Sequence, residues 1–214
     1  MTDFVILATA DWDHPLWTNK QHMALSLIDH GHRVIYIESL GLRSPRANVV
    51  DGHRILRRLQ RALRPPRRVR KNLWVWSPIV VPGGTRGFML AINRLLVRIG
   101  LSIILRHVGF KSPLLWTYNP LSLLYLSIKD FQGSIYHCVD SIQDQPGMPS
   151  ELIQRSERDL CGVMNVVFTT APELQRRLEF LNVHTYFFGN VVDADHFRRA
   201  LELELPCPKD LSLI

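Results

Sequence analysis

The sequence predicts an α/β fold of the Rossmann-like, doubly wound class, with a mostly parallel sheet of about seven strands. Three observations point to this class. Seven short apolar runs recur along the 214 residues, and several of them alternate with segments of helical periodicity. The first forty residues already have the pattern strand, helix, strand. A chain of this length with 46% hydrophobic and 21% charged residues can bury one full core.

The first strand–helix–strand unit sets the topology. Residues 4–9 form an apolar strand, and a polar loop at 10–17 separates it from a helix expected over 20–30. Thr18 and Gln21 have the spacing of a capping box at the start of this helix, and Gly31 can provide its left-handed exit. The second strand is expected at 33–38, parallel to the first because a helix connects them.

The later elements continue the alternation of strands and helices. Further strands are expected at 73–77, 113–117, 134–139, 165–169 and 183–188. Further helices are expected near 54–63, 86–107, 120–128, 150–161 and 171–181. Residues 1–200 therefore form one domain, and residues 201–214 have the composition of a linker.

Basic residues are concentrated in the middle of the chain. Of the 26 Lys and Arg residues, 15 lie between Gly52 and Lys129, a stretch that contains no Asp or Glu. Residues 53–63 place leucines on one helical face and arginines on the other, and residues 88–106 form a broadly apolar helix with one narrow polar stripe. This segregation suggests a polyanionic surface as a partner.

The basic stretch has three possible interpretations. The simplest is a solvated arginine face beside a core helix with snorkelling arginines. We favour docking on an anionic membrane surface, with arginines at the head groups and leucines near the acyl boundary. Nucleic acid is not expected as a partner, because interleaved aromatic side chains and a recognisable reading module are missing. The residues expected at the membrane surface are Arg54, Arg57, Arg58, Arg61, Arg64, Arg67, Arg68, Arg94, Arg98 and Arg106.

Signals for secretion or membrane insertion are not expected in this sequence. The N-terminus has no basic region, and residues 4–10 are too short for a secretory signal. No stretch reaches about 20 uninterrupted apolar residues. Cys138, Cys161 and Cys207 are odd in number and far apart, which favours reduced thiols in the cytosol over a disulfide framework.

The polar loop 10–17 follows the first strand, where open parallel sheets bind ligands. Asp11, Asp13 and His14 could form a haloacid-dehalogenase-type phosphatase site or a divalent-metal site, but no lysine or second acidic pair is well placed for that chemistry. The aspartates could instead cap turns. A carbohydrate pocket is the third possibility, because Trp12 and Trp17 offer flat apolar faces for a sugar ring and the loop carboxylates can accept hydroxyl hydrogen bonds.

Polar residues also follow the later strands. Tyr118 and Asn119 follow the fourth strand, Asp140 closes the fifth, and Asn190 follows the seventh. His137 lies inside a strand, where a satisfied core histidine is as reasonable as a functional one. No GxGxxG, GxxxxGK[ST] or GxSxG motif occurs, so dinucleotide-binding, P-loop and α/β-hydrolase functions lose their main support.

Five segments, spread in order over nearly the whole chain, resemble segments of one protein family. They are residues 11–22, residues 31–45, YHCVDS at 136–141, VFTTAPEL at 167–174 and GNVVDADHF at 189–197. Together they resemble the N-terminal domain of GT-B glycosyltransferases, similar to family 4 retaining enzymes of bacterial cell-surface polysaccharide synthesis, including teichuronic-acid-type transferases. The glycine-rich loop that many relatives carry after the first strand is replaced by residues 11–17. Their histidine after the fourth strand is replaced by Tyr118 and Asn119.

This resemblance implies one half of a GT-B architecture. Residues 1–200 would be the acceptor-side domain, and a donor domain that binds the nucleotide-sugar would follow the linker at 201–214. The intact enzyme would transfer a sugar to a lipid-linked or polysaccharide acceptor as a peripheral protein at the cytoplasmic face of the plasma membrane, and this half alone would be inactive. No metal or cofactor is expected, because helix dipoles and basic side chains of the donor domain would neutralise the leaving diphosphate.

The resemblance and the strand ends together give the candidate site residues. The candidate catalytic residues are Asp13, His14, Asn119 and Asp140, and the candidate acceptor contacts are Asp11, Trp12, Trp17, Thr18, Tyr118 and Asn190. The alternative function is a non-catalytic membrane-docking subunit that recruits a donor-binding chain. The donor domain is thus expected either in cis or as a separate partner.

Overall fold

The computed structural model describes residues 1–40, 65–81, 84–190, 194 and 198–201. These residues form one sheet of eight strands in the order β3-β4-β2-β1-β5-β6-β7-β8, in which only β3 is antiparallel to its neighbour. The strands are β1 (Asp3–Leu7), β2 (Arg33–Ile37), β3 (Arg67–Arg70), β4 (Leu73–Trp76), β5 (Leu114–Thr117), β6 (Gly133–Cys138), β7 (Val166–Thr169) and β8 (Thr185–Phe187).

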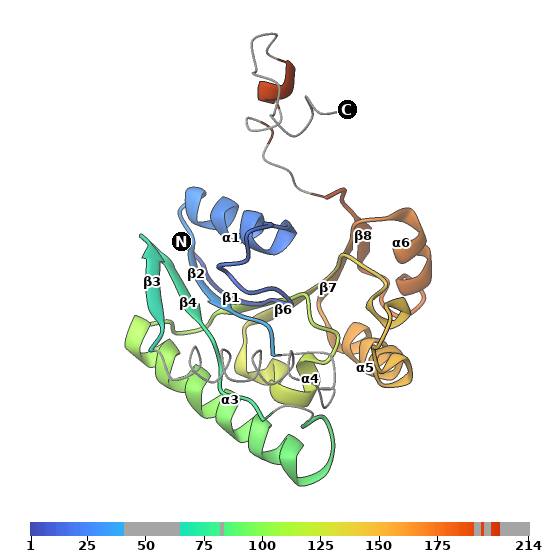
Figure 1. Cartoon of the computed structure of the whole chain (residues 1–214), viewed down its shortest axis with the longest axis horizontal. Helices are drawn as coiled ribbons and strands as arrows, with labels where there is room; N and C mark the ends of the chain where they lie inside the picture. The colour runs from blue at the N-terminus through green and yellow to red at the C-terminus, as the bar shows by residue number, and fades with distance from the viewer. Residues whose placement is uncertain (41–64, 82–83, 191–193, 195–197, 202–214) are drawn as a thin grey trace, which may run out of the picture.

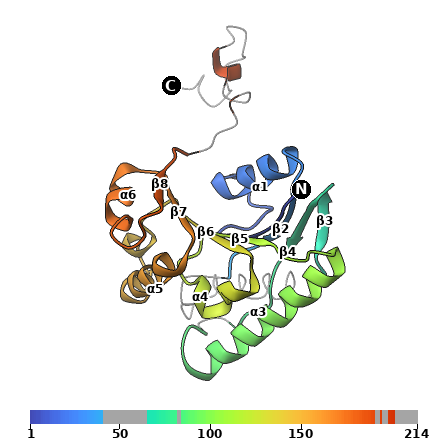
Figure 2. The same cartoon turned by 180° about the vertical axis from the view of Figure 1, so that it is seen from behind.

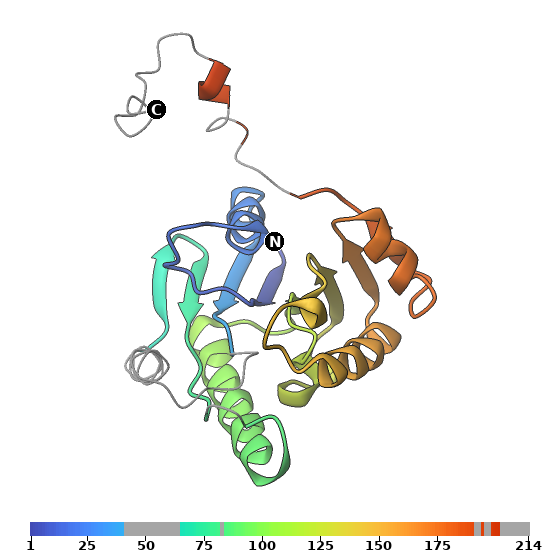
Figure 3. The same ribbon diagram turned by 45° about the vertical axis from the view of Figure 1, so that its right-hand side comes forward.

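Helices cover both faces of the sheet. They are α1 (Asn19–Asp29), α3 (Gly87–Val108), α4 (Ser122–Tyr125), α5 (Ser150–Val163) and α6 (Pro172–Leu178), with short 3-10 turns η1 (Ile128–Asp130), η2 (Ile142–Asp144) and η3 (Arg199–Leu201). Helix α1 lies on one face, and α3, α4 and α5 lie on the other (Figures 1 and 2). Figure 3 shows the same two layers after a further rotation.

Each face of the sheet has its own hydrophobic core, because alternate strand residues point to opposite faces. On the α1 side, strand residues such as Ile6 and Tyr36 pack with Ala24 of α1. On the other side, Leu7 and Ile37 pack with residues of α3, α4 and α5 such as Val97. Both cores are fully buried at their centres, so the sheet positions the strand ends rigidly.

The predicted fold class is confirmed, with eight strands instead of about seven. The additional strand is β3, an edge strand whose sequence, RRVR, carries charge on both faces and so lacks the alternation of a half-buried strand. Asn72 turns the chain back into β4 with a positive φ of 68°. The expected helix at 54–63 and the residues Arg54, Arg57, Arg58, Arg61 and Arg64 lie outside the described residues.

Helix α3 is long and apolar enough to cross a membrane when judged by length and composition alone. It has 22 residues, and its most apolar window has a mean hydropathy of 1.9 with only 22% of that window buried. The expectation that no stretch meets the length and composition criterion is therefore wrong for α3. Nevertheless, Val97, Leu101 and Ile104 pack into the core against the sheet. One face of α3 is thus held by protein, and lipid cannot surround it in the folded domain.

Candidate functional site

The chain leaves β1 and β5, which are neighbours, in opposite directions. Residues after β1 lead to α1 on one face, whereas residues after β5 lead to α4 on the other face. Such a divergence marks a topological switch point, and open α/β sheets bind ligands beyond the carboxyl ends of the strands at such points. We call this edge of the sheet the crevice. The loop 8–18, the start of α1 and the residues after β5 and β6 all lie at this edge.

Trp12 is a core residue and does not offer an exposed face for a sugar. It is 6% exposed, and its ring contacts the rings of Trp17 and Tyr36 at centroid distances of 5.2 and 5.1 Å. Its backbone N–H donates to Glu38 Oε1 at 2.8 Å, and Ser77 donates to the other carboxylate oxygen of Glu38. Glu38 therefore fixes the loop after β1 through a buried backbone contact.

The other candidates on this loop lie at its surface. Asp13 is exposed and pairs with Arg67 at 2.5 Å, which ties the loop to the edge strand β3. His14 is exposed, and its Nδ1 lies 3.0 Å from the carbonyl oxygen of Leu16. Trp17 is 39% exposed and contacts both Trp12 and His22. Of the two loop tryptophans, Trp17 keeps an accessible face.

Two of the loop candidates have structural contacts at the start of α1. Thr18 and Gln21 form the predicted capping box, in which the backbone N–H of Thr18 donates to Gln21 Oε1 at 3.0 Å. Gln21 Nε2 also donates to the carbonyl oxygen of Asp11 at 3.1 Å. The capping residues thus fix both the helix and the loop that precedes it.

Lys20 is the central charge of the crevice. Only 7% of it is exposed, and its Nζ lies 5.7 Å from the centroid of the Tyr118 ring. Burial lowers the pKa of the Lys20 ammonium, and the carboxylate of Asp140 opposes this shift. Asp140 is exposed after β6. A lysine from α1 and an aspartate from β6 therefore face each other across the carboxyl edge of β5.

Buried polar atoms without partners surround this lysine. In the part of the chain that the structure describes, Trp116 Nε1, the Tyr118 hydroxyl and both ring nitrogens of His137 are buried and make no hydrogen bond. Their rings form one cluster of tilted contacts, in which the centroid of His137 lies 4.9 Å from that of Tyr118 and 5.9 Å from that of Trp116. Unpaired buried groups of this kind are costly, and a water molecule or a ligand that reaches them can supply the missing hydrogen bonds.

Burial decides the protonation state of these groups. Desolvation, and then the charge of Lys20, lower the pKa of His137 to about 4, so the imidazole is neutral at pH 7. Burial raises the pKa of Tyr118. The neighbouring indole N–H of Trp116 opposes this rise, although it makes no hydrogen bond to the Tyr118 hydroxyl. At neutral pH the cluster thus offers a phenol O–H, an indole N–H and an imidazole that can both donate and accept.

Asn119 and Asn190 differ in their surroundings. Asn119 is 1% exposed, and its Oδ1 accepts from the backbone N–H of Leu121 at 2.8 Å. This side chain shapes the turn after β5, and its catalytic role stays a prediction. Asn190 is exposed, and its Oδ1 accepts from Asn19 Nδ2 at 2.5 Å. That bond joins the end of β8 to the start of α1 beside the crevice.

The sequence analysis missed Lys20, although a signal was present. Lys20 lies four residues before the apolar Ala24, which is buried on α1, and i and i+4 share one helical face. Trp116 was missed because a tryptophan inside a strand is usually a core residue. Among the described residues, no group of three or more His, Cys, Asp or Glu side chains lies close enough to hold a metal ion.

Comparison with known proteins supports the fold. No protein-family model matches the sequence, and no curated protein matches it. A structural match is a sucrose-phosphate synthase from Thermosynechococcus elongatus, with a TM-score of 0.55 and 11% sequence identity, over 94% of this chain and 95% of that one. The chain therefore shares the Rossmann-like α/β fold of that protein.

Proposed function

We propose that this chain is the acceptor-side half of a glycosyltransferase. The intact enzyme would transfer a sugar from a nucleotide-sugar to a lipid-linked or polysaccharide acceptor. The observation that carries the proposal is the cluster of Lys20, Tyr118 and His137 at the carboxyl edge of the sheet, in which the Tyr118 hydroxyl and both nitrogens of His137 are unpaired. The fold itself is shared with a sucrose-phosphate synthase. A sugar suits this cluster because each hydroxyl both donates and accepts hydrogen bonds.

The residues around the cluster have distinct proposed roles. Lys20 and Tyr118 are 7 and 1% exposed, so the side chains that cover them would have to move before acceptor hydroxyls could bind to them. The accessible face of Trp17 would stack on a sugar ring. Asp140 is at the rim, where its carboxylate can accept the proton of an attacking hydroxyl. Asp13 and His14 lie further out and would contact the rest of the acceptor. By the resemblance, the donor domain binds the diphosphate and this half needs no metal.

A membrane surface is the second part of the proposal. Phe88, Leu95, Ile99 and Ile103 of α3 are 78, 59, 50 and 62% exposed, and form a stripe along the helix. Arg94 and Arg98 each precede a stripe residue, so they lie about 100° around the helix from it. An apolar stripe flanked by arginines is the pattern of a helix that lies in the plane of an anionic membrane surface. The location would be the cytoplasmic face of the plasma membrane.

The end of the sheet supports a further protein contact. Edge strand β8 and its exit carry Tyr186, Phe187 and Phe188, which are 48, 45 and 59% exposed. Exposed aromatic residues in one place are typical of a surface that another domain covers. We propose that a donor domain, in cis or as a separate chain, contacts this edge. The 214-residue chain alone is then expected to bind an acceptor without transferring sugar.

The acceptor cluster is tested with sugars of known structure. Saturation-transfer NMR with methyl glycosides of glucose, N-acetylglucosamine and glucuronic acid is expected to detect binding of at least one of them. The variants K20M and Y118F should lose this signal, whereas K111M, which removes an exposed lysine elsewhere, should keep it. Equal signals from all four proteins, or sugar transfer by the purified chain alone, would contradict the proposal.

Membrane docking is tested by co-sedimentation with liposomes. Vesicles that contain phosphatidylglycerol should retain the protein, vesicles of phosphatidylcholine alone should not, and added salt should weaken retention. The double variant L95Q/I99Q removes apolar stripe residues without changing the charge and should reduce retention. Retention that ignores lipid charge and salt would exclude the electrostatic part of the docking.

A further inference from the structure

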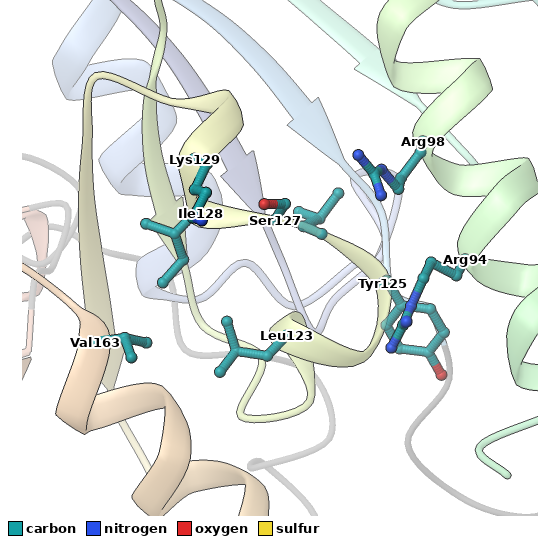
Figure 4. Close-up of a pocket in the computed structure, with 9 residues that line it drawn as sticks. Arg94, Arg98, Leu123, Tyr125, Ser127, Ile128, Lys129 and Val163 are labelled. Atoms are coloured by element: carbon teal, nitrogen blue, oxygen red, sulfur yellow. The ribbon is translucent and has the colours of Figure 1, made fainter.

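A concave site lies between α3, α4, η1 and the end of α5, and none of the crevice residues lines it. Its volume is about 540 Å³. Leu123, Leu126, Ile128 and Val163 form apolar walls, and Arg94, Arg98 and Lys129 bring cationic side chains to its rim. Figure 4 shows Arg94 and Arg98 extending from α3 towards the segment that carries Tyr125 and Ser127, with Val163 on the opposite side. We call this the flank groove.

The three cations of the flank groove differ in how far they are already paired. Arg94 Nε donates to the carbonyl oxygen of Leu124 at 2.9 Å, which leaves the rest of its guanidinium available. Arg98 faces Asp130 at 3.6 Å, a loose contact between two half-exposed side chains. Lys129 is exposed and makes no ion pair among the described residues. The groove therefore carries an excess of positive charge above apolar walls.

The flank groove is continuous with the exposed stripe of α3. Arg94 and Arg98 line the groove and also immediately precede Leu95 and Ile99 of the stripe. A molecule in the groove would thus have its anionic part at these arginines and its apolar part beside a surface that is itself apolar. Among small amphiphiles, a membrane phospholipid has this combination of a phosphate and adjoining acyl chains.

We propose that the flank groove binds the phosphate of an anionic glycerophospholipid, with the first acyl carbons against Leu123, Ile128 and Val163. This inference rests on the membrane docking proposed above and specifies it. Docking by the α3 stripe alone would not fix the position of any single lipid relative to the helix. A bound headgroup would instead fix the rotation of α3 on the membrane, because the phosphate enters from one side of the helix only.

The groove is tested with a phospholipid that forms no membrane. Dihexanoyl-phosphatidylglycerol, kept below its micelle concentration, is titrated into the full chain by calorimetry, with dihexanoyl-phosphatidylcholine and inorganic phosphate as comparisons. Saturable binding of the anionic lipid is expected, with weaker binding of the other two. R98Q/K129Q should bind it about 30-fold more weakly, since each basic residue near a headgroup contributes roughly fivefold. Arg94 is left unchanged because of its bond to Leu124.

Two further variants separate charge from shape. R155Q/R158Q removes two exposed arginines of α5 that do not line the groove and should bind like the wild type. V163W fills the groove without changing the charge and should abolish binding. Binding that survives both R98Q/K129Q and V163W overturns the proposal, and so does inorganic phosphate that competes as well as the lipid. If L95Q/I99Q loses liposome retention but still binds the short lipid, the groove is supported independently of the stripe.

Discussion

His137 gives the sharpest test of the crevice, because its environment makes the stability of the domain depend on pH. The imidazole is 5% exposed between aromatic rings, and burial together with Lys20 lowers its pKa from 6.5 to about 4. In the unfolded chain the same group takes up a proton near pH 6.5. Between about pH 6.5 and 4 the unfolded state therefore binds one more proton than the folded state, and stability falls as the pH falls. A shift of this size corresponds to about 3 kcal/mol.

The variant H137F isolates this contribution. Phenylalanine fills a similar volume among the rings and removes both unpaired nitrogens, so we expect a folded protein. Urea unfolding is measured from pH 4 to 7.5 for both proteins, since carboxylates also titrate in this range and only the difference between the curves belongs to His137. The wild type should lose about 3 kcal/mol more than H137F on acidification. Parallel curves of unfolding free energy against pH, or an imidazole of His137 that titrates near pH 6.5 by NMR, would refute the reasoning. The control variant H14F measures the effect of losing an exposed imidazole.

Two further predictions concern the packing that holds α3 and α5. A methyl group on Gly100 would collide with the buried ring of Trp76, so G100A should lower the unfolding free energy by about 1–3 kcal/mol. The methyl group added by G162A meets open space, so this substitution should raise the unfolding free energy by up to about 1 kcal/mol. Similar effects of the two substitutions in chemical denaturation would contradict this account of α3 packing. R177A leaves the buried carboxylate of Glu157 without its ion-pair partner and should lower the unfolding free energy by about 3–5 kcal/mol. A loss below about 1 kcal/mol in chemical denaturation would contradict this prediction.

The strand positions could be predicted because each core strand is a short run of apolar residues with a polar residue at its end. All seven expected strands occur, and β3 was missed because Arg67 and its neighbours satisfy their backbone at the sheet edge while their side chains remain in water. The same polar composition would suit a loop. Edge strands therefore escape a prediction that depends on hydrophobic pattern alone.

The site was predicted in outline but not in its residues. A sequence shows which residues follow a strand, so Tyr118 and Asp140 were found. It does not show which way a loop side chain turns, and Trp12 folds inward because Tyr36 and Glu38 bind it on the next strand. Asn119 is likewise occupied by the backbone that it shapes. Such contacts join residues that are distant in sequence, and they leave no local pattern.

Three buried tyrosines at this sheet differ in whether their hydroxyl groups have a hydrogen-bond partner. The Tyr36 hydroxyl donates to the carbonyl oxygen of Ala10 at 3.0 Å, and the Tyr136 hydroxyl donates to Glu157 at 2.6 Å, whereas the Tyr118 hydroxyl has no partner. If this contrast reflects a binding site, Y118F should be at least as stable as the wild type, while Y36F and Y136F should each lose about 1 kcal/mol. Unfolding free energies measured in urea decide this. A loss in Y118F equal to that in Y36F would mean that its hydroxyl is already satisfied, and the physical reason for placing a sugar there would disappear.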